Sequence, residues 1–167
     1  MSADRWVVRA ASLDDVQRIA ELVALKVRPG DTIALRGDLG AGKTTFARAL
    51  IRALLGNAEA EIPSPTFPLV QTYETPRLGV WHFDLYRLSG EDELVETGFP
   101  DDCARGLALV EWPERAGALL GADRLDLMIA PGGSPDVRTV TLEGGTSWGP
   151  RIARLAQIDA FVAASLG

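Results

Sequence analysis

The segment Gly37–Thr44 combines glycines, a lysine and a threonine at the spacing G-x-x-x-x-G-K-T. Glycines allow a backbone to turn its N–H groups toward phosphate oxygens, and the Lys43 side chain adds a positive charge. The Thr44 hydroxyl is suited to ligate magnesium. The alternative is a glycine-rich turn where a lysine stands by chance, but Lys26 and Lys43 are the only lysines of the chain. The pattern therefore predicts a phosphate cradle for a nucleotide.

The neighbours of this segment provide the setting that such a cradle requires. The apolar run Thr32–Leu35 precedes it as a strand candidate, and a helical pattern that includes Phe46–Leu50 follows. Phosphate groups bind favourably at a helix N-terminus, where free N–H groups and the helix dipole meet them. We therefore expect a strand, a phosphate loop and a helix in that order.

Two acidic residues end apolar strand candidates and could act beside the loop. Glu111 follows the fully apolar run Leu107–Val110, which is typical of a central parallel strand, and Asp84 follows the shorter run Trp81–Phe83. Magnesium bound to ATP needs a carboxylate opposite the phosphate loop. We assign Glu111 to magnesium, through a water molecule, and Asp84 to positioning or activating the attacking water. Each could instead be a solvated carboxylate at a strand end.

Five further residues have two readings each. His82 is the only histidine, which excludes a histidine-pair metal site. It could be a packed or capping residue, which is the commoner case for a lone strand histidine, or it could make a functional contact. Arg87 could meet a phosphate or a partner, or be solvated surface. Trp112 could lie near the nucleotide or fill the core. Ser64 and Thr66 could sense the γ-phosphate or make turn hydrogen bonds.

Composition limits the class of protein. A chain of 167 residues that is 47% hydrophobic predicts one domain over residues 1–167. Its net charge of −6 disfavours binding to nucleic acid without partners. The single cysteine, Cys103, excludes an internal disulfide and predicts no disulfide-linked partner. Since no signal-peptide or membrane-spanning run is present, we expect a cytoplasmic protein without membrane attachment.

Periodicity predicts alternating strands and helices, and hence an α/β, three-layer P-loop NTPase fold with a mixed, partly antiparallel central sheet. Strands are predicted at 6–9, 32–36, 69–74, 80–84, 107–111, 125–130 and 137–143. Helices are predicted from Ser12 as N-cap through Val27, and at 43–55, 91–97, 101–105 and 151–166. Three prolines exclude a helix over 61–68, and the short connection 75–79 predicts an antiparallel hairpin.

Taken together, these motifs closely resemble the TsaE (YjeE) family. The resemblance rests on the order and spacing of four segments. These are Gly37–Thr45; Ser64–Phe67 together with Leu69, Val70 and Tyr73; His82–Leu88; and Val110–Glu114. It covers about residues 32–115. It implies a bacterial cytoplasmic P-loop ATPase required for threonylcarbamoylation of adenosine 37 in tRNAs that read codons beginning with adenine.

The resemblance also implies ligands, partners and roles for residues. ATP is held by Gly37, Asp38, Leu39, Gly40, Ala41, Gly42, Lys43, Thr44 and Thr45. Thr44 and Glu111 hold Mg2+, and Asp84 is implicated in hydrolysis. TsaB and TsaD are the implied partners, and the acidic charge leaves tRNA contact to them. Because no arginine finger stands in a motif context, we expect feeble intrinsic hydrolysis that the partners modulate.

Several other functions use similar motifs. A GTPase is disfavoured because Asn57, the only asparagine, does not begin an N-K-x-D motif. Residues 88–92 superficially resemble an ABC ATPase signature but lack its second glycine, and Ser89 is more simply a helix N-cap. A small-molecule kinase with the same loop stays open, as does an ATP-dependent interaction module without turnover.

Overall fold

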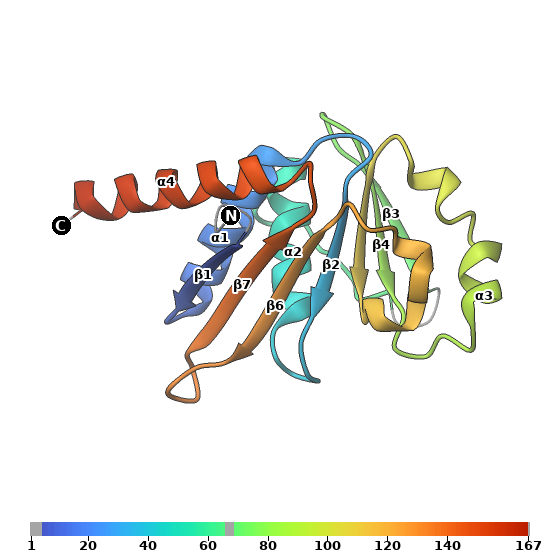
Figure 1. Cartoon of the computed structure of the whole chain (residues 1–167), viewed down its shortest axis with the longest axis horizontal. Helices are drawn as coiled ribbons and strands as arrows, with labels where there is room; N and C mark the ends of the chain where they lie inside the picture. Colours follow the sequence, from blue (N-terminus) through green and yellow to red (C-terminus); the bar gives the residue numbers. More distant parts are fainter. Residues whose placement is uncertain (1–4, 66–68, 167) are drawn as a thin grey trace.

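The computed structural model describes residues 5–65 and 69–166. A seven-stranded sheet lies at its centre, in the order β1-β7-β6-β2-β5-β4-β3 (Figure 1). The strands are β1 (Arg5–Ala10), β2 (Thr32–Arg36), β3 (Val70–Glu74), β4 (Gly79–Asp84), β5 (Leu107–Glu111), β6 (Leu125–Pro131) and β7 (Arg138–Gly144). The helices are α1 (Leu13–Lys26), α2 (Lys43–Leu55), α3 (Glu91–Glu96) and α4 (Gly149–Leu166), with 3-10 helices η2 (Asp101–Cys103) and η3 (Pro113–Leu120).

The centre of the sheet is parallel and its edges are antiparallel. Strands β6, β2, β5 and β4 run parallel, while β3 pairs antiparallel with β4, and β7 pairs antiparallel with both β6 and β1. This confirms the predicted mixed sheet. Because parallel strands end at a common edge, β2, β5 and β4 bring the phosphate loop, Glu111 and Asp84 to one side of the molecule.

Helices cover the two faces of the sheet unequally. On one face α1, α2 and α4 bury a large apolar core that includes Ile19, Phe46 and Trp148. On the other, α3, η2 and η3 cover the half formed by β2, β5 and β4. The half formed by β1, β7 and β6 has no described helix over it on that side, and Val7 and Met128 are 49% and 41% exposed there (Figure 1). The three layers are therefore complete over the half that carries the acidic residues.

Local signals explain both ends of helix α1. The Ser12 hydroxyl accepts the N–H of Asp15 at 3.3 Å, as predicted for an N-cap. The helix buries an apolar stripe of Val16, Ile19, Ala20, Val23 and Ala24. It ends at Lys26, so the prediction that Val27 is helical was wrong by one residue: Val27 is already extended.

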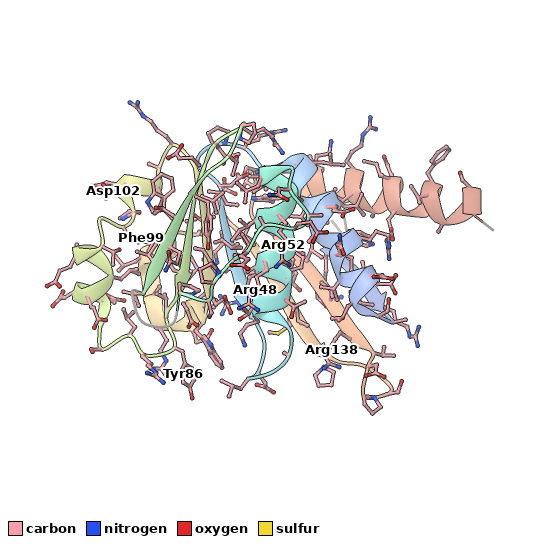
Figure 2. All side chains as sticks on the ribbon, turned by 180° about the vertical axis from the view of Figure 1, so that it is seen from behind. Arg48, Arg52, Tyr86, Phe99, Asp102 and Arg138 are labelled. Carbon is pink, nitrogen blue, oxygen red and sulfur yellow. The ribbon has the colours of Figure 1, made fainter. Side chains whose placement is uncertain are left out.

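Helix α2 holds the proline-rich segment that follows it. Gly56, with φ of 69°, ends the helix, and the chain then runs back along it. Arg48 and Arg52 donate to the carbonyls of Ile62 and Ala60, each at 2.9 Å (Figure 2). Residues 61–65 are non-helical, as predicted. These two hydrogen bonds fix Ser64 near the loop end of the helix.

Other boundaries differ from the predicted ones. Leu69 precedes β3 with a left-handed φ of 63° and is not part of the strand. The N-cap of α3 is Gly90, not Ser89. The predicted helix at 101–105 is the three-residue turn η2, and η3 was not predicted. α4 begins two residues earlier than predicted, at Gly149.

No helix formed by residues 5–65 and 69–166 combines the length and apolarity needed to cross a membrane.

Cys103 is buried at the end of η2, and burial raises the pKa of its thiol to about 11. The thiol therefore stays protonated and unreactive near neutral pH.

Candidate functional site

The phosphate loop connects β2 to α2 through glycines in conformations that other residues avoid. Gly37, Gly40 and Gly42 have φ of 148°, 77° and 115°. A β-carbon on Gly37 would lie only 2.6 Å from the carbonyl oxygen of Ile129 on β6. Gly37 is therefore required both by its backbone angle and by the close approach of β6.

Lys43, the first residue of α2, is turned back onto the loop. It is 5% exposed, and its Nζ donates to the carbonyls of Gly37 and of Asp38, the latter at 2.9 Å. The ammonium lies 4.0 Å from the centre of the Trp112 ring. Burial lowers the pKa of Lys43, and carboxylates led by Glu111 oppose that effect. The loop thus holds a buried cation where phosphate oxygens would compete with its own carbonyls.

Thr44 and Glu111 are in direct contact. The Thr44 hydroxyl donates to Glu111 Oε1 at 2.8 Å, and Glu111 is only 2% exposed. The solvated strand-end alternative for Glu111 is therefore wrong. A hydroxyl and a carboxylate side by side are hard oxygen ligands of the kind that Mg2+ prefers.

A buried histidine completes the surroundings of Glu111. His82 on β4 is fully buried, and its Nε2 lies 2.7 Å from Glu111 Oε2. The sequence favoured a packed or capping residue over a functional contact. His82 is packed, but it also contacts one of the candidate site residues.

Asp84 lies next to Glu111 across the parallel pair β4–β5, where the two residues share a register position. One carboxylate oxygen accepts the N–H of Tyr86 at 3.0 Å. Burial raises the pKa of Asp84, the Tyr86 hydrogen bond opposes this, and the Glu111 carboxylate adds to it. Two neighbouring carboxylates in a partly buried place favour a nearby cation.

Lys43, Thr44, Asp84 and Glu111 line one cleft of about 350 Å3, whereas the predicted loop residues Gly37, Asp38 and Ala41 are not among its lining residues. Its walls are Leu39, Gly40, Gly42, Lys43, Thr44, Thr45, Ser64, Asp84, Tyr86, Glu111 and Trp112. Trp112 is half-buried and stacks near Tyr86, with ring centres 5.0 Å apart. Arg87 is exposed and is not part of the wall, and Thr66 lies outside the described residues. The structure therefore brings together four segments that are distant in sequence.

A second hollow of about 660 Å3 lies on the other side of the loop. It shares Gly40, Gly42 and Thr45 with the cleft and is also lined by Ser12 and Arg138. The Arg138 Nε donates to the carbonyl of Ala41 at 3.1 Å. Figure 2 shows Arg138 and Tyr86 along the same edge of the molecule.

Sequence reasoning missed Tyr86 and Arg138 as site residues. Arg138 is 97 positions from Ala41 and reaches the loop because β6 pairs with β2 and β7 with β6. Tyr86 stands between the predicted site residue Asp84 and Arg87 in the sequence. An aromatic side chain so close to a predicted site acid was a usable signal.

The donor set fits a magnesium nucleotide better than a bare metal ion. The described residues contain no group of three His, Cys, Asp or Glu side chains arranged to hold a metal. Thr44 and Glu111 offer two oxygens, and Mg2+ in phosphate-transfer sites commonly completes its shell with phosphate oxygens and water. The loop amides and Lys43 would hold those phosphates. The groups present are therefore those that a nucleoside triphosphate with its metal would require.

Comparison with known proteins gives consistent similarities. The family model described as threonylcarbamoyl adenosine biosynthesis protein TsaE matches residues 10–139. A protein of Rickettsia felis named tRNA threonylcarbamoyladenosine biosynthesis protein TsaE is 43% identical over 101 residues, 60% of this chain and 58% of that protein. The match thus spans less than two thirds of that relative's length.

A sequence and a solved structure from Bacillus subtilis match over more of their length. The sequence, named tRNA threonylcarbamoyladenosine biosynthesis protein TsaE, is 35% identical over 138 residues, which cover 82% of this chain and 83% of that protein. The crystal structure of YdiB superposes with a TM-score of 0.75 and 31% identity, covering 93% of this chain and 96% of that one. The sheet and its helices are therefore shared with a solved structure.

Proposed function

This chain belongs to the TsaE family, and from that premise we propose that it is an ATP-binding, weakly hydrolysing accessory protein. Its proposed role is in threonylcarbamoylation of adenosine 37 in tRNAs that read codons beginning with adenine. The names of its relatives in Rickettsia felis and Bacillus subtilis, both tRNA threonylcarbamoyladenosine biosynthesis protein TsaE, support the pathway.

The contact between Thr44 and Glu111 is the observation that carries the ATPase proposal. It joins the phosphate loop to the strand-end acid, so the two proposed Mg2+ ligands are already adjacent. Mg2+ would neutralise charge that develops on the phosphate oxygens. Lys43 would exchange the carbonyls of Gly37 and Asp38 for phosphate oxygens, which keeps its buried charge paired throughout.

Asp84 is the residue proposed to position or activate the attacking water. Its carboxylate lines the same cleft as Thr44 and Glu111, and the Tyr86 N–H fixes one of its oxygens. The other oxygen is left to orient a water molecule toward the terminal phosphate. The raised pKa of Asp84 makes this carboxylate a better proton acceptor than one in water.

The hollow beside Ser12 and Arg138 is the proposed place for the base and ribose. It lies on the side of the loop away from Glu111 and Asp84 and shares the loop glycines with the cleft. A nucleotide whose phosphates follow the loop would reach both spaces. Adenine is preferred over guanine because the sequence lacks an N-K-x-D motif.

The proposed partners are TsaB and TsaD, in the cytoplasm, with tRNA contacted only through them. No arginine is among the described residues that line the cleft, so the chain supplies no arginine finger there. Such a residue commonly accounts for a large part of hydrolysis rate. We therefore expect slow turnover alone and altered turnover with partners.

Phosphate release from ATP tests the proposal. It should be measured for the chain alone, with TsaB and TsaD, and with tRNA added, in the absence of any phosphoryl acceptor. Slow release that changes with the partners is the expected result. Fast hydrolysis indifferent to partners would contradict it, and ATP consumed only with an added small-molecule acceptor would indicate a kinase.

A further inference from the structure

The carboxylate of Glu111 has a different hydrogen-bond partner on each of its oxygens. Oε1 accepts from the Thr44 hydroxyl at 2.8 Å, and Oε2 lies 2.7 Å from Nε2 of His82. Thr44 is the second residue of α2, whereas His82 lies within β4. One partner is thus part of the phosphate loop, and the other belongs to the interior of the sheet.

The strand register explains how His82 reaches this position. His82 pairs with Leu109 on β5, and Leu109 is two residues before Glu111. Residues two apart on a strand face the same side of the sheet, so the side chains of His82 and Glu111 both face α2. His82 is fully buried and Glu111 is 2% exposed. The histidine therefore lies two register positions further from the carboxyl end of β5 than Glu111, in the buried interior.

Within the described part of the chain, the hydrogen bond to Glu111 is the single polar contact of the His82 ring. Its Nδ1 is buried and has no partner among the described residues. Because an ionised carboxylate only accepts hydrogen bonds, Nε2 carries the hydrogen and donates it. Burying an unpaired Nδ1 costs free energy that an apolar side chain would avoid, so packing alone does not account for a histidine here.

We propose that His82 is a positioning residue that holds the Glu111 carboxylate so that Oε1 faces Thr44 and the magnesium site. The inference rests on the proposed nucleotide function of that site. Partners of this kind orient metal ligands, and their loss commonly weakens metal affinity by about 10- to 100-fold. Glu111 without His82 would be free to rotate away from Thr44.

The affinity for ADP across a series of free Mg2+ concentrations tests this role. Calorimetry on the full chain gives the Mg2+ concentration at which half of the gain in affinity is reached. H82L and H82M remove the donor and should raise that concentration about tenfold or more. H82Q keeps an N–H near the position of Nε2 and should stay within about threefold of the unsubstituted chain, and ADP binding in EDTA should not change.

A matched control comes from the next residue. Phe83 is equally buried on β4 but faces the other side of the sheet. F83L perturbs the core without touching Glu111. The Mg2+ concentration at which half of its gain in ADP affinity is reached, the magnesium midpoint, should therefore be unchanged. A wild-type midpoint in H82L or H82M, or a shift in H82Q as large as in H82L, would overturn the proposal.

Nitrogen-15 NMR of the unsubstituted protein gives a second readout that does not depend on variants folding. His82 is the only histidine, so its ring signals need no assignment. They should show the tautomer with hydrogen on Nε2, and E111A should shift that signal. The opposite tautomer would refute the inference. If the unsubstituted chain binds no ADP, the proposed function fails, while the NMR result still decides the His82–Glu111 contact.

Discussion

Thr44 and Glu111 lie 67 positions apart in the chain and are joined by a hydrogen bond of 2.8 Å. Thr44 lies in the first turn of α2 and Glu111 ends β5, so the contact connects the helix that follows the phosphate loop to the centre of the sheet. Both positions follow from parallel pairing of β2 with β5, which places the loop and the acid at one edge. Assembly of the proposed metal site is therefore a property of the fold itself.

Replacement of Glu111 should separate metal-dependent turnover from binding. E111A removes the carboxylate but leaves the loop amides and Lys43, so ADP affinity in EDTA should change little. Turnover with Mg2+ should fall roughly 100-fold, comparable with loss of a single electrostatic stabiliser of a transition state. Phosphate release and calorimetry measure the two effects. An equal loss of binding in EDTA would argue against a metal role for Glu111.

Replacement of Lys43 should abolish nucleotide binding. Its buried ammonium donates to the loop carbonyls of Gly37 and Asp38, and K43A removes this charge from the cradle. Lys26, the only other lysine, lies at the end of α1, and K26A is the matched control. Equilibrium binding of labelled ATP measures both. Normal binding by K43A would mean that the cradle is wrongly assigned.

Tryptophan fluorescence should report the same event in the unsubstituted protein. The Lys43 ammonium lies over the Trp112 ring in the described structure, and phosphates would draw it away. ATP should therefore change the emission intensity, and W112F should remove most of the change although Trp6, Trp81 and Trp148 are retained. A signal that persists in W112F would place the sensitive ring elsewhere.

Replacement of Asp84 should stabilise the ligand-free protein. Burial raises the pKa of Asp84 above its unfolded value, so stability from this group is present at low pH and is lost as pH rises through the folded pKa. D84N keeps an oxygen for the Tyr86 N–H without the charge. At pH 7 its Tm should rise by about 1–3 °C, since ~1 kcal/mol shifts a domain of this size by about 2–4 °C.

Thermal unfolding of D84N and the unsubstituted chain over a pH series supplies the check. The difference in Tm between the two proteins should shrink as pH falls below the folded pKa of Asp84. The side chain at position 84 is then neutral in both folded proteins. The gain in stability should accompany lower ATP turnover, as is common at active sites. A lower Tm for D84N at pH 7 would show that the ionised carboxylate is stabilised in the fold.

Local patterns predicted the parts of the site that are contiguous in sequence. The glycine spacing of the loop and the apolar run before Glu111 are each read within a few residues, and the structure places both at the expected sheet edge. Their contact was inferred from the chemistry of magnesium, which requires a carboxylate near the loop hydroxyl.

What could not be predicted depends on distant or irregular backbone. Arg138 reaches Ala41 only through the pairing of β7, β6 and β2. Helix η3 contains Gly117 at φ of 58° and ψ of −134°, which interrupts any helical periodicity. The His82–Glu111 contact depends on the register of β4 against β5, and a strand sequence alone does not determine register.

A buried ion pair at the opposite end of β2 should govern stability without governing ligand binding. Arg151 on α4 is bound in a two-pronged pair to Asp31, with N–O distances of 2.7 and 2.9 Å, and lies 3.7 Å above the Trp148 ring. R151M removes this charge and leaves Asp31 buried without its partner. Loss of one partner of a buried pair costs about 3–5 kcal/mol, so Tm should fall by roughly 10 °C.

Two variants separate the ion pair from other effects of the substitution. R154M changes an exposed arginine on the same helix and should leave Tm within about 1 °C, as surface changes usually do. Adding D31N to R151M removes the unpaired charge but keeps an oxygen for the N–H of Arg28, so part of the stability should return. Because Asp31 precedes β2 and the phosphate loop follows it, ADP affinity well below Tm should be unchanged in R151M. A loss of affinity there would mean that α4 is coupled to the nucleotide site through β2.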